Sequence, residues 1–293
     1  TTLRLDIEQT LFGLEEPSRP DPGEGSVSTL APGNVSVQPE EPEEGKTPAA
    51  SGPNVMDIDF DALIANETDS TLKDMHEYFR DRTPTEKNQY TGMFQGKNLL
   101  LFTGEAFWIG AVNEQYTPTL YKLAHSGFVF ENFYNPLWYY STVDGEYAAT
   151  TGLIPTNQVN ASQRYAGKNG VSMYFSMGNQ LRALGYPTLA FHNNTANYYD
   201  RNLSHPNLGY DFYACDTGLD VAMTWPQSDL EMMQLTLPQA LAGEKPFHNY
   251  YMTVSGHMNY SFAGNAMSAK HRDEVADLDM SEAARAYLAC NME

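Results

Sequence analysis

Cysteine, positive charge and long apolar runs are all scarce in this sequence, and each shortage excludes a class of protein. Only two cysteines occur, Cys215 and Cys290, without C-x-x-C spacing, which excludes a disulfide scaffold and a cysteine-based zinc site. One structural disulfide or two buried thiols stay open, and we favour the thiols. Lysine and arginine number 17 against 37 acidic residues. This balance argues against a nucleic-acid partner, because binding to phosphates rests on those cations.

The sequence contains no run of about 18 apolar residues, and therefore no candidate membrane span. It starts abruptly with TTLRLDIEQTLFG, without a signal-peptide pattern. We interpret residues 1–14 as a segment that follows a membrane region outside the sequence. Hydrophobic residues make up 41% of the 293 residues, which suffices for one large α/β domain or two small ones.

Residues 15–53 differ in composition from the rest of the chain. They hold eight of the 17 prolines and seven glutamates, with almost no large apolar side chains. Such a stretch buries too little surface to offset its ordering entropy. We predict an acidic, flexible linker here, with a recognition tail as the alternative, and a folded domain over residues 54–293.

From residue 54 onward, helical patterns alternate with short apolar runs, which predicts a mostly parallel sheet sandwiched by helices. Strands are predicted at 99–102 (buried on both faces), 128–134, 187–193 and 248–257. Helices are predicted within 59–84, 116–127, 141–155, 172–186, 230–246 and 281–293, and a loop at 194–216. Thr117 and Ser281 are predicted helix caps.

Polar residues follow the predicted strands. Glu105 comes just after the first strand, His192 and His257 follow two later ones, and the pair Ser141-Thr142 opens a helix after the strand at 128–134. The carboxyl ends of parallel strands share one edge, where ligands bind, so we expect these groups to lie together. Each also has a structural interpretation: a solvated turn carboxylate, ordinary histidines, or a hydroxyl that caps a helix.

The chemistry that such a set suits is phosphoryl or sulfuryl transfer. A threonine hydroxyl needs a base or a metal to become a nucleophile, and a helix N-terminus attracts anionic phosphate. Glu105 is a hard oxygen ligand suited to magnesium, manganese or zinc. Arg201 is a candidate for binding phosphate oxygens in a bidentate manner, with a solvated loop arginine as the alternative.

Five ordered segments resemble the lipoteichoic acid synthase family of the alkaline phosphatase and sulfatase superfamily. They are NLLLFTGEAF, TPTLYKLAHSGFVFENFY, STVDGEYAATTGLIP, FHNNTANYYDRN and TVSGHMNYSF. The family consists of extracellular, membrane-anchored glycerophosphotransferases. The resemblance implies that Thr142 is the nucleophile and that Glu105 and Thr142 bind the metal. It also implies that four residues line the substrate pocket: His192, Tyr199, Arg201 and His257.

The sequence departs from this family at two points. Family members usually carry tryptophan where this chain has Tyr199, and they complete the metal site with an Asp-His pair that is absent here. We therefore expect a chain truncated before that pair, with two of four metal ligands, and with uncovered strand edges and apolar surface. The implied cation is manganese, with magnesium or zinc as alternatives.

The resemblance implies transfer of glycerol phosphate from phosphatidylglycerol to a teichoic acid polymer or glycolipid through a threonine-linked intermediate. The expected location is the extracellular face of the bacterial membrane, with N-terminal anchoring helices outside this chain, which is itself expected to be an inactive fragment. The alternatives are a phosphoethanolamine transferase, a phosphodiesterase, a sulfatase, or a non-catalytic scaffold that binds the polymer. A sulfatase is disfavoured, because the C/S-x-P-x-R pattern is missing around Thr142.

Overall fold

The computed structural model describes residues 51–56, 58–134, 139 and 141–293. The chain divides into two compact units between Gly96 and Lys97. The predicted N-terminal segment lies outside the described residues, as does the predicted linker apart from residues 51–53.

The smaller unit contains the two short helices predicted before Pro84, α2 (Phe60–Asn66) and α3 (Ser70–Arg80). Both helices begin at an aspartate whose side chain caps the first turn. Asp59 accepts a hydrogen bond from the backbone N–H of Ala62, and Asp69 accepts from two N–H groups of α3. These caps satisfy amides that have no partner inside the helix.

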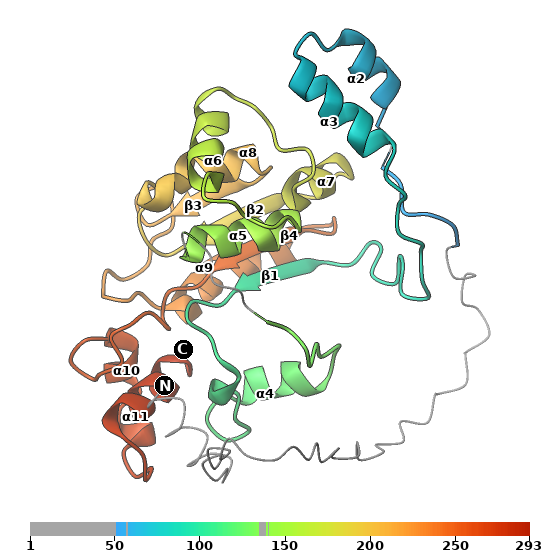
Figure 1. Cartoon of the computed structure of the whole chain (residues 1–293). Coiled ribbons are helices and arrows are strands. Elements are labelled where there is room, and N and C mark those ends of the chain that lie inside the picture. Colours follow the sequence, from blue (N-terminus) through green and yellow to red (C-terminus); the bar gives the residue numbers. More distant parts are fainter. Residues whose placement is uncertain (1–50, 57, 135–138, 140) are drawn as a thin grey trace, which may run out of the picture. The chain divides into compact units, whose positions relative to one another are not determined.

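The larger unit is built on a parallel four-stranded sheet in the order β1-β4-β2-β3 (Figure 1). The strands are β1 (Leu99–Thr103), β2 (Thr188–His192), β3 (Asp211–Ala214) and β4 (His248–Met252). The predicted α/β class with a mostly parallel sheet is confirmed, as are the predicted strands near residues 99, 188 and 248.

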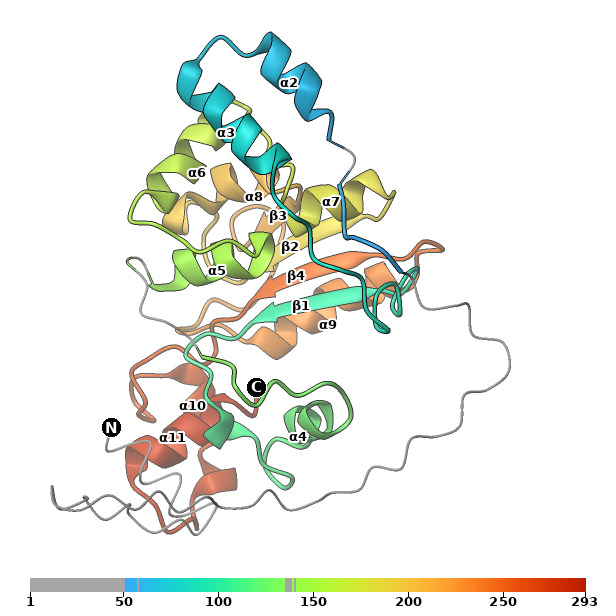
Figure 2. The same cartoon turned by 45° about the vertical axis from the view of Figure 1, so that its right-hand side comes forward.

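Helices lie on both sides of the sheet, with α5, α6, α7 and α8 on one side and α9 on the other (Figure 2). The helices of this unit are α4 (Pro118–His125), α5 (Ser141–Thr151), α6 (Val159–Lys168), α7 (Met177–Ala183), α8 (Arg201–Asn207), α9 (Asp229–Leu241), α10 (Ala266–Lys270) and α11 (Glu282–Cys290). Short 3-10 turns occur at Ile109–Ala111, Tyr198–Asp200 and Asp273–Val275.

One apolar cluster packs on each face of the sheet, and two smaller clusters form around α11. Ala190 and Tyr250 pack with Leu208 in the first cluster, whereas the adjacent residues Phe191 and Tyr251 belong to the second. This alternation follows from the period of two in a strand. Three of these side chains are fully buried, so the two central strands are covered on both faces.

The strand predicted at 128–134 is wrong: this segment is irregular apart from a turn at 131–132, and its large apolar side chains are exposed. Aromatic residues favour strands only where a neighbouring strand is available to pack against, and the described residues offer none here. The burial predicted for β1 is also wrong, since Leu100 is 38% and Phe102 47% exposed. β1 lies at an edge of the described sheet, where an exposed apolar face was indeed expected.

The predicted loop at 194–216 is wrong as well, because it contains α8 and β3. The helix predicted from residue 172 starts only at Met177, where Ser176 caps it. Ser281 caps α11 as predicted. Thr117 occupies the cap position of α4, but its hydroxyl donates to the carbonyl of Ala111 instead.

The two cysteines are free, as favoured from the sequence: Cys290 is buried, while Cys215 is only half-buried. Among the described residues, no helix combines the length and apolar character that crossing a bilayer requires.

Candidate active site at the carboxyl edge of the sheet

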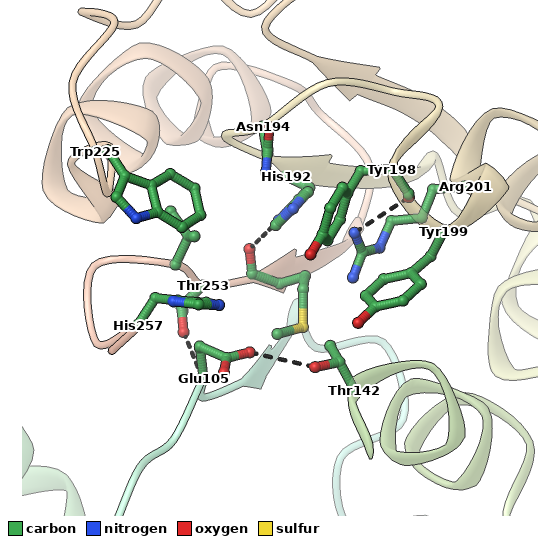
Figure 3. Close-up of a pocket in the computed structure, with 12 residues that line it drawn as sticks. Glu105, Thr142, His192, Asn194, Tyr198, Tyr199, Arg201, Trp225, Thr253 and His257 are labelled. Atoms are coloured by element: carbon green, nitrogen blue, oxygen red, sulfur yellow. Dashed lines mark hydrogen bonds between the residues drawn. The ribbon is translucent and has the colours of Figure 1, made fainter. Parts of the chain in front are cut away.

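All of the predicted site residues line one pocket beyond the carboxyl ends of β1, β2 and β4 (Figure 3). These residues are Glu105, Thr142, His192, Tyr199, Arg201 and His257. They come from five segments that span more than 150 positions of the sequence, and the parallel sheet brings them together because its strand ends share one edge. The side chain of Ser141, the other candidate hydroxyl, lies outside what the structure describes.

Thr142 lies in the first turn of α5 and faces the end of β1. Its Oγ1 lies 3.4 Å from Oε2 of Glu105, to which it donates a hydrogen bond. Glu105 is held in turn by its backbone N–H, which donates to the hydroxyl of Thr253 at 2.8 Å. The threonine hydroxyl therefore points at a carboxylate of another element, at the positive end of a helix. This is the arrangement that a nucleophile needs, and capping α5 does not require it.

His192, the last residue of β2, provides a neutral imidazole. Its Nδ1 donates to the carbonyl of Met252 at 3.0 Å, so Nε2 carries the lone pair. Nε2 is buried and has no partner among the described residues. Burial, aided by the positive charge of Arg201, lowers the pKa of His192 to about 3. The ring can therefore accept a hydrogen bond from a hydroxyl group of a ligand.

The pKa of His192 predicts a loss of stability in acid. The unfolded chain takes up a proton near pH 6.5, whereas the folded chain does so only near pH 3, so the free energy of unfolding falls as the pH drops through this window. The loss attributable to this ring is about 1.4 kcal/mol per pH unit. We expect His192→Asn, which keeps a donor for Met252, to show a shallower slope in urea unfolding between pH 6 and 4. Equal slopes in the two proteins would contradict the assignment.

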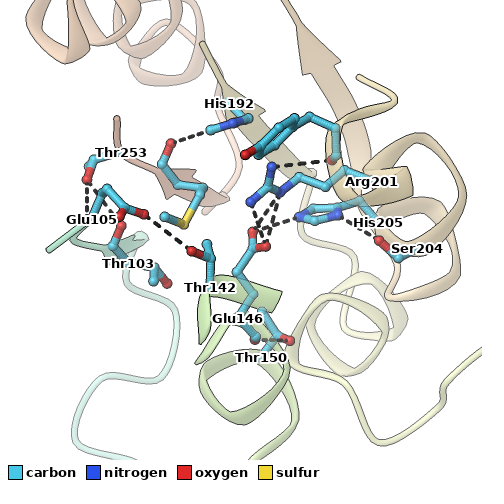
Figure 4. Close-up of polar contacts among 12 residues, drawn as sticks. Thr103, Glu105, Thr142, Glu146, Thr150, His192, Arg201, Ser204, His205 and Thr253 are labelled. Atoms are coloured by element: carbon cyan, nitrogen blue, oxygen red, sulfur yellow. Dashed lines mark hydrogen bonds and ion pairs between the residues drawn. The ribbon is translucent and has the colours of Figure 1, made fainter. Parts of the chain in front are cut away.

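Arg201 is fully buried at the start of α8, so the loop-arginine alternative is wrong. Its Nε and Nη2 atoms lie 3.0 Å and 2.9 Å from Oε2 of Glu146, forming a buried bidentate ion pair (Figure 4). The hydroxyl of Tyr250 and the ring of His205 also contact this carboxylate. Burial alone would raise the pKa of Glu146, but Arg201 and His205 outweigh it and hold the pKa well below its ordinary value.

Glu146 is not among the site residues predicted from the sequence. It follows Thr142 by four residues, one turn of helix, so the spacing places both on the same side of α5. That spacing was visible in the sequence, but its partner Arg201 comes from a distant segment. The sequence offers no comparable indication for the remaining residues of the pocket wall, among them Trp225, Tyr198 and Asn194.

Aromatic rings stand on opposite sides of the pocket. Trp225 contacts His257 with ring centroids 5.0 Å apart, and Tyr198 and Tyr199 stand on the side of Arg201 (Figure 3). The Tyr199 ring lies 5.4 Å from the guanidinium carbon of Arg201. A sugar-like or glycerol group between these walls would be confined by stacking and apolar contact.

Backbone strain is concentrated at this pocket. The described non-glycine residues with positive φ are Ala106, directly after Glu105, and the consecutive pair Tyr199 and Asp200. Each such conformation costs about 1–3 kcal/mol and occurs preferentially at functional sites. Asp200 is further fixed by an ion pair with Arg164. The strain is consistent with a backbone shaped for a ligand.

The loop that carries His257 is held from beneath by a buried carboxylate. Asp229, the first residue of α9, accepts hydrogen bonds from the backbone N–H groups of Val254 and Ser255 and from the Ser255 hydroxyl. Burial raises the pKa of Asp229. These contacts fix the turn after β4, and thereby the position of His257.

The predicted metal ligands provide two hard oxygen atoms, one from Glu105 and one from Thr142. These fit the kind of donor that manganese or magnesium prefers. The part of the chain that the structure describes contains no group of three or more histidine, cysteine, aspartate or glutamate side chains suited to a metal. The two oxygens alone are too few to hold such an ion tightly.

Known proteins resemble the larger unit of this chain. The profile of the sulfatase family matches residues 97–293. The chain is 23% identical over 221 residues to lipoteichoic acid synthase 2 of Bacillus subtilis (strain 168), covering 70% of this chain and 33% of that protein. It is 20% identical over 196 residues to the lipoteichoic acid synthase-like YvgJ of the same organism, covering 64% of this chain and 31% of the relative.

Among solved structures, the chain is similar to the lipoteichoic acid synthase LtaP from Listeria monocytogenes. The TM-score is 0.54 at 21% identity, and the match covers 69% of this chain and 50% of that one. The chain spans about a third of the length of the curated relatives it matches. With the family profile matched over 97–293, the chain belongs to the sulfatase family, and the predicted resemblance to lipoteichoic acid synthases is confirmed as a similarity to such proteins.

Proposed function

We propose that this site transfers glycerol phosphate from phosphatidylglycerol to a teichoic acid polymer or glycolipid. The observation that carries the proposal is the contact of the Thr142 hydroxyl with Glu105 at the N-terminus of α5. The names of the matched relatives support a role in lipoteichoic acid synthesis. Because the chain spans only part of those proteins, the substrates and the acceptor belong to the proposal.

The reaction consists of two displacements at phosphorus. In the first, the Thr142 oxygen attacks the phosphodiester, the bond from phosphorus to the diacylglycerol oxygen breaks, and diacylglycerol leaves with a proton. In the second, a hydroxyl group of the acceptor attacks the glycerophosphoryl-threonine, and the threonine oxygen leaves and regains its proton. Each step exchanges one ester bond for another, so no oxidant or nucleotide is required.

The remaining residues bind and orient the substrate. Arg201 donates N–H groups to the phosphoryl oxygens, and Nε2 of His192 accepts a hydrogen bond from a glycerol hydroxyl. His257 and Tyr199 confine the headgroup at the rim. The tyrosine at position 199 keeps a stacking face and adds a hydroxyl that glycerol can reach.

We further propose that a divalent cation, manganese in preference to magnesium or zinc, binds at Glu105 and Thr142 together with ligands beyond these two. When bound, it lowers the pKa of the hydroxyl and stabilises charge on the phosphoryl oxygens.

The proposed location is the extracellular surface of the bacterial membrane, where the donor lipid resides. Segments other than the described helices would attach the protein there, and no nucleic-acid partner is proposed.

Removal of metal ions tests whether donor cleavage needs the proposed cation. We expect a chelator to stop donor cleavage by the full-length protein, and added Mn²⁺ to restore it. Glu105→Gln loses a charged ligand and should need more Mn²⁺ for half-maximal recovery. Equilibrium dialysis of this chain with Mn²⁺ should show weak binding that Glu105→Gln weakens further. Cleavage that persists after chelation, or equal Mn²⁺ requirements in the two proteins, would contradict the proposal.

A panel of labelled lipids tests the donor. Full-length protein is incubated with phosphatidylglycerol or phosphatidylethanolamine, and diacylglycerol release is measured. We expect release from phosphatidylglycerol and much less from phosphatidylethanolamine. The reverse preference would favour a phosphoethanolamine transferase, and release from neither lipid, with polymer still bound, would favour a scaffold.

A further inference from the structure

Glu146 lies behind Arg201 and does not line the pocket itself. Its carboxylate is 6% exposed and Arg201 is 2% exposed, so water does not screen the pair. Helix α5 carries both Glu146 and Thr142, one turn apart, and the carboxylate is held further by the Tyr250 hydroxyl at 3.1 Å. The element that presents the proposed nucleophile therefore also fixes the guanidinium (Figure 4).

Contacts with the described residues take three of the five N–H groups of Arg201 and leave two for a ligand. Glu146 takes the Nε hydrogen and one hydrogen of Nη2. The carbonyl of Tyr198 lies 3.4 Å from Nη1 and takes one more. One hydrogen on each terminal nitrogen remains, and two such donors, here called the fork, suffice for two oxygens of a phosphoryl group. The two N–H donors stay available, while the negative charge of Glu146 offsets the positive charge of the guanidinium.

We propose that Glu146 is a positioning residue that sets the charge preference of the site, favouring a singly charged phosphodiester over a doubly charged phosphomonoester. The inference rests on the proposed function of this site. A ligand with two negative charges feels the repulsion of Glu146 twice as strongly as a ligand with one. The low pKa of Glu146 supports this, because it keeps the carboxylate charged at neutral pH. The fork, by contrast, gives both ligands the same hydrogen bonds.

Small esters test the proposal without turnover. The full 293-residue chain is titrated at pH 8.5 with dimethyl phosphate, which carries one charge, and with methyl phosphate, which carries two. In Glu146→Gln we expect the ratio of the two affinities to shift toward methyl phosphate by about tenfold. This is the effect of removing one unit charge that lies within about 10 Å of the second charge of the ligand, at an effective dielectric of about 20. Thr150→Val, a buried change on the same helix without contact to the guanidinium, should keep the parental ratio.

Two further variants separate charge from structure. The double change Glu146→Gln with Arg201→Gln removes both charges, so both affinities should fall. Arg201→Gln alone leaves Glu146 uncompensated and should shift the ratio toward dimethyl phosphate. The ratio in this variant should lie further toward dimethyl phosphate than in the double variant, and that difference tests the charge of Glu146 without the single variant Glu146→Gln.

The outcomes distinguish this inference from the proposed function. If the parent chain binds neither ester, the phosphoryl site itself is contradicted. If the parent binds both, and the ratio does not move in folded Glu146→Gln or is the same in Arg201→Gln and in the double variant, Glu146 has only a structural role and the inference is overturned.

Discussion

Alanine at position 142 is expected to lower the rate of diacylglycerol release by about 10⁴-fold or more, the effect that follows loss of an attacking nucleophile. The stability should hardly change, because Thr142 is half-buried and its hydroxyl makes only a long contact with Glu105. We expect the free energy of unfolding to stay within about 1 kcal/mol of the parent. Rates of donor cleavage and urea unfolding, measured on the same preparations, check both statements.

Thr142→Ser is the matched control. It keeps the hydroxyl and should retain measurable cleavage, whereas Thr142→Val keeps the shape and should be as inactive as alanine. Parental rates in alanine or valine would show that another group attacks phosphorus. The neighbouring hydroxyl of Ser141 would then be the next candidate, and Ser141→Ala would identify it.

The second large effect concerns stability. Arg201→Met should destabilise the chain by about 3–5 kcal/mol, because it leaves the buried carboxylate of Glu146 without its cation. The double variant Arg201→Met with Glu146→Leu should recover most of this loss, since apolar side chains of similar volume replace a buried ion pair with little change in stability. Urea unfolding at pH 7 gives both values.

The same pair predicts a dependence on pH. The pKa of Glu146 is lower in the folded chain than in the unfolded one, so its contribution is complete above pH 4.5 and is lost as the pH falls below that value. The double variant lacks this loss. If Arg201→Met and the double variant were equally destabilised, the ion pair would not be the source of the effect.

The sequence pattern was informative where burial is nearly complete. The strands β2 and β4 are short, and a proline lies one or two residues before each of them. Because the carboxyl ends of parallel strands share one edge, the sequence alone predicts that His192 lies at that edge. The same argument placed Glu105 and His257 at the shared edge.

The errors have local causes. The helix α8 was not recognised because Pro206 lies inside it and because Tyr199 and Asp200, just before it, have positive φ. Neither feature belongs to the usual helix pattern. The segment 128–134 has the composition of a strand, but strand formation also needs a neighbour, which composition does not reveal. The role of Glu146 likewise depends on a contact between distant segments.

The most direct test is to look for the covalent intermediate. Full-length protein is incubated with phosphatidylglycerol labelled in the headgroup, quenched in acid, digested and examined by mass spectrometry. A glycerophosphoryl group is expected on Thr142, present in the parent and absent in Thr142→Ala. Label on a different residue, or steady cleavage of the lipid with no labelled peptide at any time, would contradict it.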